Sequence, residues 1–149
     1  MKTLINTSLL CLLFALPVSS STWSELMPIH QGFDIEEFET AVGIDNSICM
    51  VMHNEDLDQI QASFFQNGQW STPEVLDDRE DLGYPHICAS PLGGFHAIWQ
   101  LNRSKRCHIR YTPDEGWGEI TQAQSYGGQI VCDPDGLLYQ LRLKEIGFD

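Results

Sequence analysis

The chain has 149 residues, of which 42% are hydrophobic and 10% aromatic, so it is long enough and apolar enough for one domain with a buried core. Its formal net charge is −13, with 21 acidic and 8 basic residues. This charge disfavours nucleic acids and anionic membrane surfaces as partners, because both are bound through Lys and Arg. A cationic partner, divalent metal ions or simple solubility are compatible with it, and solubility is the simplest of these interpretations.

The first 20 residues have the pattern of a secretory signal peptide. Lys2 gives a positive start, residues 4–18 are almost wholly apolar, and small residues follow at 19–21. The apolar run is too short to favour a membrane anchor. We therefore expect a signal peptide over residues 1–20, no membrane span after its cleavage, and a secreted or periplasmic protein.

Four cysteines remain after this expected cleavage, and all are disulfide candidates: Cys49, Cys88, Cys107 and Cys132. Four cysteines in an exported protein allow three connectivities, and the sequence does not choose among them. Their spacing lacks the CxxC pattern of a zinc site or a thioredoxin-like motif. Buried free thiols are the alternative to bridges.

The mature chain begins with a predicted lone strand over residues 22–29, which contains Trp23, and an acidic loop over residues 31–39. A first unit then spans about residues 38–76. Its four predicted strands are residues 40–44, 47–53, 59–65 and 70–76.

A second acidic linker, residues 77–81, leads to a second unit over about residues 85–123. Its predicted strands are residues 86–90, 95–101, 106–112 and 117–123. A third unit, about residues 128–143, supplies only two strands, at 129–132 and 137–143. No segment after the signal peptide shows a sustained helical period, so we expect almost no helix.

Turn chemistry supports the division into units. Asn67-Gly68 lies between apolar runs and predicts a type I′ hairpin, whose two central residues need positive φ. The first two strands of each unit are joined by similar turn residues, at Asp45-Asn46, Gly93-Gly94 and Asp135-Gly136. Trp23, Trp70 and Trp117 are equally spaced in the sequence, so we expect them to occupy one slot in successive units.

Four antiparallel strands that repeat every 40–50 residues or so are typical of a β-propeller blade. We therefore predict an all-β fold of β-propeller-like blades, about two and a half in number, which form an incomplete ring. A plain β-sandwich is the alternative, because it also has short strands at regular spacing. Propellers close with about four to eight blades, so closure would need self-association into a homo-oligomer, and a remnant of a longer gene or a small open stack are the other solutions.

The units resemble the blades of sialidase-type propellers, the BNR or Asp-box group, and similar lectin-like propellers. The resemblance rests on residues 65–73 and 111–117 and covers about residues 23–143. In the Asp-box pattern Ser-x-Asp-x-Gly-x-Thr-Trp, the first half is matched by Thr112, Asp114 and Gly116, although Trp117 follows the glycine directly. The resemblance implies a propeller fold.

The same resemblance would imply an arginine triad and a Tyr–Glu nucleophile pair in an active sialidase. The mature part has five arginines and no Arg-Ile-Pro motif, and no G-x-S-x-G, H-E-x-x-H or P-loop pattern occurs. We therefore expect no catalytic residues. We also expect no cofactor and no metal, because residues 133–136 (Asp-Pro-Asp-Gly) fit a hairpin turn better than a calcium loop.

Four aromatic side chains of the second unit are candidates for ligand binding: Trp99, Tyr111, His96 and His108. If the hairpin turns at Arg103-Ser104, His108 falls opposite Trp99, and His96 falls opposite Tyr111. Such cross-strand pairs mainly stabilise sheets, so packing is the first interpretation and a binding wall the second. Trp99 breaks the repeat pattern, which makes it the better candidate for stacking on a sugar ring, although core packing is still its first interpretation.

Together these features predict an exported, non-catalytic, propeller-like protein that binds a glycan or a protein, or assembles with itself. The alternatives are a truncated relative of a sialidase-type glycoside hydrolase and a structural β-sandwich protein.

Overall fold

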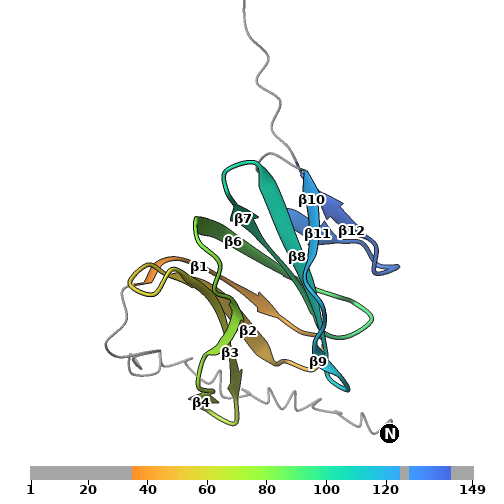
Figure 1. The fold of residues 1–149 in the computed structure, drawn as a ribbon. Coiled ribbons are helices and arrows are strands. Elements are labelled where there is room, and N and C mark those ends of the chain that lie inside the picture. Colours follow the sequence, from red (N-terminus) through yellow and green to blue (C-terminus); the bar gives the residue numbers. More distant parts are fainter. Residues whose placement is uncertain (1–34, 125–127, 142–149) are drawn as a thin grey trace, which may run out of the picture.

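The computed structural model describes residues 35–124 and 128–141 of the chain. Regular structure in these residues consists of strands alone, arranged in three open antiparallel sheets (Figure 1). Since these residues contain no helix, none of them forms an apolar helix that could cross a bilayer. The all-β prediction is confirmed, whereas the predicted signal peptide, the strand at residues 22–29 and Trp23 lie outside the described residues.

The first sheet follows the chain order of the first predicted unit. Its three long strands, β1 (Ile35–Val42), β2 (Ile48–Asn54) and β3 (Gln59–Gln66), are successive antiparallel neighbours. The short strands β4 (Gln69–Trp70) and β5 (Glu74–Asp77) both pair with β3. The fourth predicted strand of this unit is therefore split into two.

The second sheet repeats this arrangement. Strands β6 (Leu82–Ala89), β7 (Phe95–Leu101) and β8 (Lys105–Thr112) are successive neighbours. The strands β9 (Gly116–Trp117) and β10 (Thr121–Gln124) both pair with β8. The last predicted strand of this unit is split in the same manner as in the first.

The third sheet consists of β11 (Ile130–Cys132) and β12 (Leu138–Gln140), paired antiparallel. Strand β6 contacts both β1 and β11, so the first strands of the three sheets are neighbours in space. The sheets therefore succeed one another along the chain and in the structure.

Two predicted acidic loops are corrected by the structure. Strand β1 begins at Ile35, so Glu37 and Glu39 belong to a strand and not to a solvated loop over residues 31–39. Asp77 ends β5 and is 5% exposed, so the predicted linker at residues 77–81 begins with a buried carboxylate. Carboxylates were expected to be solvated in both places because a charge is rarely buried without a partner.

The first hairpin of each sheet closes with the same pair of backbone hydrogen bonds. In each loop the N–H of the first residue donates to the carbonyl of the fifth, and the N–H of the fourth donates back to the carbonyl of the first, over 2.8–3.1 Å. The three loops are residues 43–47, 90–94 and 133–137. The first hairpin loops of the three sheets therefore share one hydrogen-bonded geometry.

Positive φ angles occur at the predicted turns. Asn67 and Gly68 have φ of 53° and 80°, as a type I′ turn requires. Gly94 has φ of 84°, and a Cβ placed on it would lie 2.0 Å from the carbonyl oxygen of Tyr111. This glycine is needed both for its backbone angle and for the close approach of β8.

Trp70 and Trp117 occupy equivalent positions in the first and second sheets. Trp70 pairs with Phe65 and Trp117 with Tyr111, at the ends of β3 and β8. The ring centroids are 5.3 Å apart in the first pair and 5.2 Å apart in the second. The prediction of one repeated slot is confirmed for these two indoles.

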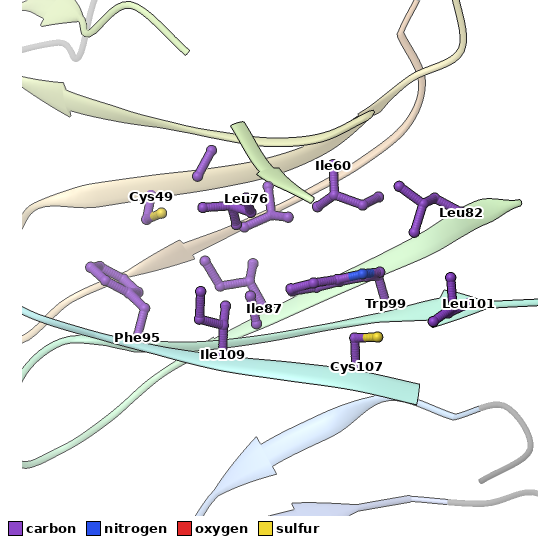
Figure 2. Packing of buried hydrophobic residues seen from close by; sticks show 13 residues of the cluster. Cys49, Ile60, Leu76, Leu82, Ile87, Phe95, Trp99, Leu101, Cys107 and Ile109 are labelled. Atoms are coloured by element: carbon purple, nitrogen blue, oxygen red, sulfur yellow. The ribbon is translucent and has the colours of Figure 1, made fainter. Parts of the chain in front are cut away.

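The hydrophobic core lies between the first and second sheets (Figure 2). Period-2 alternation sends every second side chain of β2, β3, β7 and β8 into this layer. Its largest member, Trp99, has no exposed surface. The buried members of this central cluster are Cys49, Val51, Ile60, Ala62, Leu76, Leu82, Ile87, Phe95, Ala97, Trp99, Leu101, Cys107 and Ile109.

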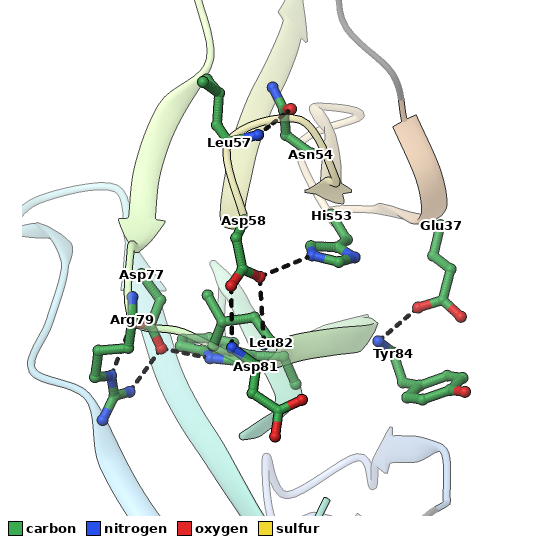
Figure 3. Close-up of polar contacts among 11 residues, drawn as sticks. Glu37, His53, Asn54, Leu57, Asp58, Asp77, Arg79, Asp81, Leu82 and Tyr84 are labelled. Carbon is green, nitrogen blue, oxygen red and sulfur yellow. Dashed lines mark hydrogen bonds and ion pairs between the residues drawn. The ribbon is translucent and has the colours of Figure 1, made fainter. Parts of the chain in front are cut away.

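A buried carboxylate connects the two sheets within this core. Asp77 accepts hydrogen bonds from Trp99 Nε1 at 2.7 Å and from Arg79 Nε and Nη2 at 2.8 and 2.6 Å (Figure 3). Arg79 Nη2 also lies 3.2 Å from Cys107 Sγ. Burial by itself would raise the pKa of Asp77, but the hydrogen bonds from Arg79 and Trp99 outweigh it, and the net effect is a lowered pKa.

Carboxylates of the first sheet also accept hydrogen bonds from backbone N–H groups in β6 or just before it. Figure 3 shows those accepted by Glu37 and Asp58. These N–H groups lie at the edge of the second sheet, where no neighbouring strand offers carbonyl acceptors. Side-chain carboxylate oxygens therefore accept the hydrogen bonds that a paired strand would accept. The pairs are Glu37 with Tyr84, Glu39 with Ile87, and Asp58 with both Asp81 and Leu82.

We predict that Gly94→Ala destabilises the protein more than Gly93→Ala. Both glycines have positive φ, so each substitution should cost about 1 kcal/mol in backbone strain. Only Gly94 faces the Tyr111 carbonyl, and this clash should bring its total to at least about 3 kcal/mol. Urea denaturation of both variants measures the difference, and equal losses would contradict the close approach.

We predict that Asp77→Asn lowers the free energy of unfolding by about 2 kcal/mol, because it removes the buried charge that Arg79 and Trp99 donate to. The neighbouring exposed residue gives the matched control: Asp78→Asn should change stability by less than about 0.5 kcal/mol. Chemical denaturation of both variants measures the difference. A general effect of lost negative charge would destabilise the two variants equally and would contradict the role of the buried Asp77 carboxylate.

Candidate binding site on the far face of the second sheet

The second sheet has a polar face that points away from the central cluster. Successive side chains of β7 and β8 point to opposite faces of the sheet. The residues between the core positions therefore lie on the face away from the core. This far face holds three of the chain's five histidines and two of its arginines. Its members are His86, Cys88, His96, Ile98, Gln100, Arg106, His108 and Arg110.

A hollow of about 570 Å³ opens on this face, near the end of β7 and the start of β8. Its lining combines two guanidinium groups, an imidazole, an amide and an aromatic ring, all suited to binding a polar ligand. The lining residues are Tyr84, His86, Gln100, Arg103, Arg106 and Gly128.

Arg106 is the most unusual member of this lining because it is only 6% exposed. Its Nη1 donates to the Tyr84 carbonyl at 3.3 Å, but within the described part of the chain its buried Nε has no hydrogen-bond partner. Burial lowers the pKa of Arg106, and the nearby Glu37 carboxylate opposes that change. The hollow thus lies beside a buried cationic donor that no atom of the described residues satisfies.

Tyr84 lies at the rim of the hollow in a conformation that few residues adopt. It has φ of 52°, it falls in the irregular stretch of the β6–β7 ladder between Gly83 and His86, and it is 55% exposed. Positive φ in a bulky residue is costly unless the surroundings impose it. The irregularity therefore holds an aromatic ring out toward solvent beside the arginine.

A second hollow of about 360 Å³ lies beside the first, lined by β1 and β6. Its two carboxylates are already engaged: Glu37 accepts from Tyr84 N, and Glu39 Oε2 accepts from Ile87 N at 2.9 Å and lies 3.1 Å from His86 Nδ1. These acids bind the protein's own groups, whereas Arg106 Nε has no hydrogen-bond partner among the described residues.

His96 and His108 contact each other on the same face. His96 Nδ1 lies 2.9 Å from His108 Nε2, and the rings stack with centroids 5.2 Å apart. Burial first, and then His108 and Arg110, lower the pKa of His96 to about 4. Burial and Arg110 also lower the pKa of His108. Both rings are therefore neutral near pH 7, and one donates to the other.

The structure separates the four predicted binding residues onto two faces. His96 and His108 lie on the far face, whereas Trp99 is wholly buried and Tyr111 packs against Phe64, with ring centroids 4.5 Å apart. Trp99 has no surface on which a sugar could stack.

The predicted cross-strand pairs were wrong by one residue. Trp99 is opposite Cys107 and Ile98 is opposite His108, because Leu101 pairs with Lys105 and leaves a three-residue turn at 102–104. A slip of one residue exchanges the two faces of a strand. Arg106 was missed for this reason, whereas Tyr84 and His86 lie on β6, whose register with β7 the sequence did not predict.

The loop at residues 133–137 is a turn, as predicted. Asp133 Oδ1 accepts hydrogen bonds from Asp135 N at 3.0 Å and Leu137 N at 2.8 Å, and Oδ2 accepts from the Tyr139 hydroxyl at 3.1 Å. The described residues contain no group of three or more His, Cys, Asp or Glu side chains that could hold a metal ion.

The four predicted disulfide candidates fall into two classes. Cys49 and Cys107 are wholly buried in the central cluster. Cys88 and Cys132 are half-buried, on β6 and β11, and their Sγ atoms are 3.1 Å apart. The structure therefore brings only the second pair of thiols together among the described cysteines.

We predict that stability falls by roughly 2–3 kcal/mol as pH drops from 6.5 toward 4. Over this range the unfolded chain protonates at His96 while the folded protein does not, so protons favour unfolding. His96→Gln should flatten this part of a stability–pH curve measured by urea denaturation. His108 and Arg110 face the same imidazole, and an unchanged slope in the variant would contradict the assignment of this pH dependence to His96.

Comparison of the chain with protein-family models, with curated proteins and with solved structures gives no match.

Proposed function

We propose that this is an exported, non-catalytic binding protein of β-propeller-like construction, and that its ligand is an acidic saccharide. The observation that carries the binding proposal is the Arg106 guanidinium, which is 6% exposed, lines the hollow and has no partner for Nε within residues 35–124 and 128–141. A buried cation is costly, and an anionic ligand group in the hollow would lower that cost through its opposite charge.

The propeller-like part of the proposal is supported by the way the sheets succeed one another. The described long strands of each sheet follow chain order as a simple meander, and none crosses to another sheet, unlike the Greek-key connections of sandwiches. The first strands β1, β6 and β11 are neighbours, as in successive blades. Closure into a ring would require further sheets, which a homo-oligomer would supply.

The net charge of the protein narrows the class of anion. At −13 the chain repels polyanions, so a nucleic acid or a highly sulfated polymer is disfavoured. A single carboxylate is attracted locally by Arg106 and Arg103 without large long-range repulsion. A ligand with one negative charge therefore fits best.

The remaining lining favours a sugar as the carrier of that carboxylate. Gln100 and His86 provide hydrogen-bonding groups for hydroxyls, and the exposed Tyr84 ring provides an apolar face for stacking. Glu37 and Glu39 are held by backbone and imidazole groups, which supports binding without hydrolysis.

Binding is tested by titration calorimetry at low salt with glucuronate as the acidic probe and glucose as its neutral counterpart. We expect glucuronate to bind at least about 10-fold more tightly than glucose, since a charge-assisted hydrogen bond is worth about 1.5–3 kcal/mol. Arg106→Gln should abolish this preference. Inorganic phosphate in a parallel titration distinguishes a preference for carboxylates from general anion binding.

Arg110→Gln is the matched control, because Arg110 lies on the same strand and face but outside the lining of the hollow. Tyr84→Ala, an exposed position, should weaken both sugars and leave the fold intact. Equal binding of glucose and glucuronate, or equal losses in the two arginine variants, would overturn the proposal. Turnover of a chromogenic sialoside panel would instead favour the glycoside hydrolase alternative.

A further inference from the structure

We propose that Cys88 and Cys132 form a disulfide in the mature protein, and that this bond fastens the third sheet to the second. Their Sγ atoms are 3.1 Å apart, so a bond of ordinary length requires a shift of only about 1 Å. Cys88 lies on β6 and Cys132 on β11, two strands that contact each other.

The repeat explains why these two positions face each other. Cys88 stands two residues before the loop at 90–94, and Cys132 stands one residue before the loop at 133–137. Because side chains alternate along a strand, this difference of one puts them on facing sides of adjacent sheets. The equivalent pair between the first and second sheets is Ala41, two residues before the loop at 43–47, and Ala89, one residue before the loop at 90–94. Both alanines pack against the central cluster.

The other two cysteines are not suited to this bond. Cys107 lies on the opposite face of the second sheet and contacts Arg79 Nη2. Cys49 Sγ lies 4.0 Å from the Met50 carbonyl, and burial raises the pKa of its thiol to about 12. Both are therefore expected to stay reduced within the core.

The third sheet has few other means of attachment. It consists of two strands of three residues, and an isolated two-stranded hairpin is at best marginally stable in water. Leu137, Tyr139 and Leu141 are exposed, and of its hydrophobic side chains only Ile130 is buried within the described residues. A covalent link between two cysteines that are 44 positions apart in the sequence restricts the unfolded chain and so favours the docked state.

The bond forms by thiol–disulfide exchange with a small-molecule disulfide, such as oxidised glutathione. One cysteine thiolate attacks the donor disulfide, which releases one thiol and leaves a mixed disulfide. The second thiolate then attacks the mixed disulfide and releases the other thiol. Two protein thiols are thereby oxidised, the donor disulfide is reduced to two thiols, and the two protons end on these products.

The link also bears on the hollow, and this part rests on the proposed function. Gly128, which lines the hollow, lies four residues before Cys132, while Tyr84 and His86 lie on the same strand as Cys88. A disulfide would therefore hold Gly128 beside the β6 wall. Reduction should weaken glucuronate binding about 10-fold or more, because the site is then less preorganised.

The test maps thiols in protein exported into an oxidising compartment. The protein is denatured without reductant, alkylated and digested. We expect alkylation at Cys49 and Cys107 and a cross-linked peptide that contains Cys88 and Cys132. Alkylation of all four cysteines, or a cross-link that joins another pair, would overturn the proposal. This readout does not depend on any ligand.

Thermal unfolding with and without dithiothreitol gives a second measurement. Reduction should lower the Tm of the wild type by roughly 10 °C. Cys88→Ser, Cys132→Ser and the double variant should all share the lowered value and not respond to reductant. A double variant that still responds would overturn the assignment. If the cross-linked protein binds glucuronate and its affinity does not change after reduction, the disulfide has no role in shaping the hollow. That result would leave the disulfide assignment itself in place.

Discussion

The position of the two large sheets depends on one buried carboxylate. Asp77 ends the last strand of the first sheet, and its buried carboxylate accepts hydrogen bonds from the buried Trp99 indole and from the partly exposed Arg79 guanidinium. A buried charge is tolerated only when its donors are in place, so the sheets must meet at the spacing and angle that bring Trp99 to Asp77. The packing of the central cluster and the orientation of the second sheet are thus coupled through this residue.

The same use of carboxylates explains how an acidic chain can have a basic face. Glu37, Glu39 and Asp58 of the first sheet accept backbone N–H groups at the edge of β6, so part of the negative charge is built into the junction between the sheets. The far face of the second sheet then carries Arg106 and Arg110. The net charge of the whole chain consequently says little about the charge of the site.

Strands and turns could be predicted from the sequence because their signals are local. Asn67-Gly68 requires positive φ at two successive residues, and the turn has it. The predicted cross-strand partners of the site residues depended on the register of β7 with β8. The turn between these strands has positive φ at both Asn102 and Arg103, and it sets a register one residue away from the predicted one. The sequence of β7 alternates between mainly polar positions and apolar positions, and Trp99 is one of the apolar ones. This alternation alone could have assigned Trp99 to the core face without knowledge of the turn.

The repeat also shows where deviations from a pattern carry information about function. Trp99 is unique to its unit, yet it fills the core, because Asp77 provides the partner that its N–H requires. Arg106 is equally unusual, but its Nε has no such partner in the described residues. An exceptional side chain in a repeat must therefore first be assigned to a face, and then its hydrogen bonds must be accounted for. Only a group left unsatisfied by that accounting, such as Arg106, argues for a ligand.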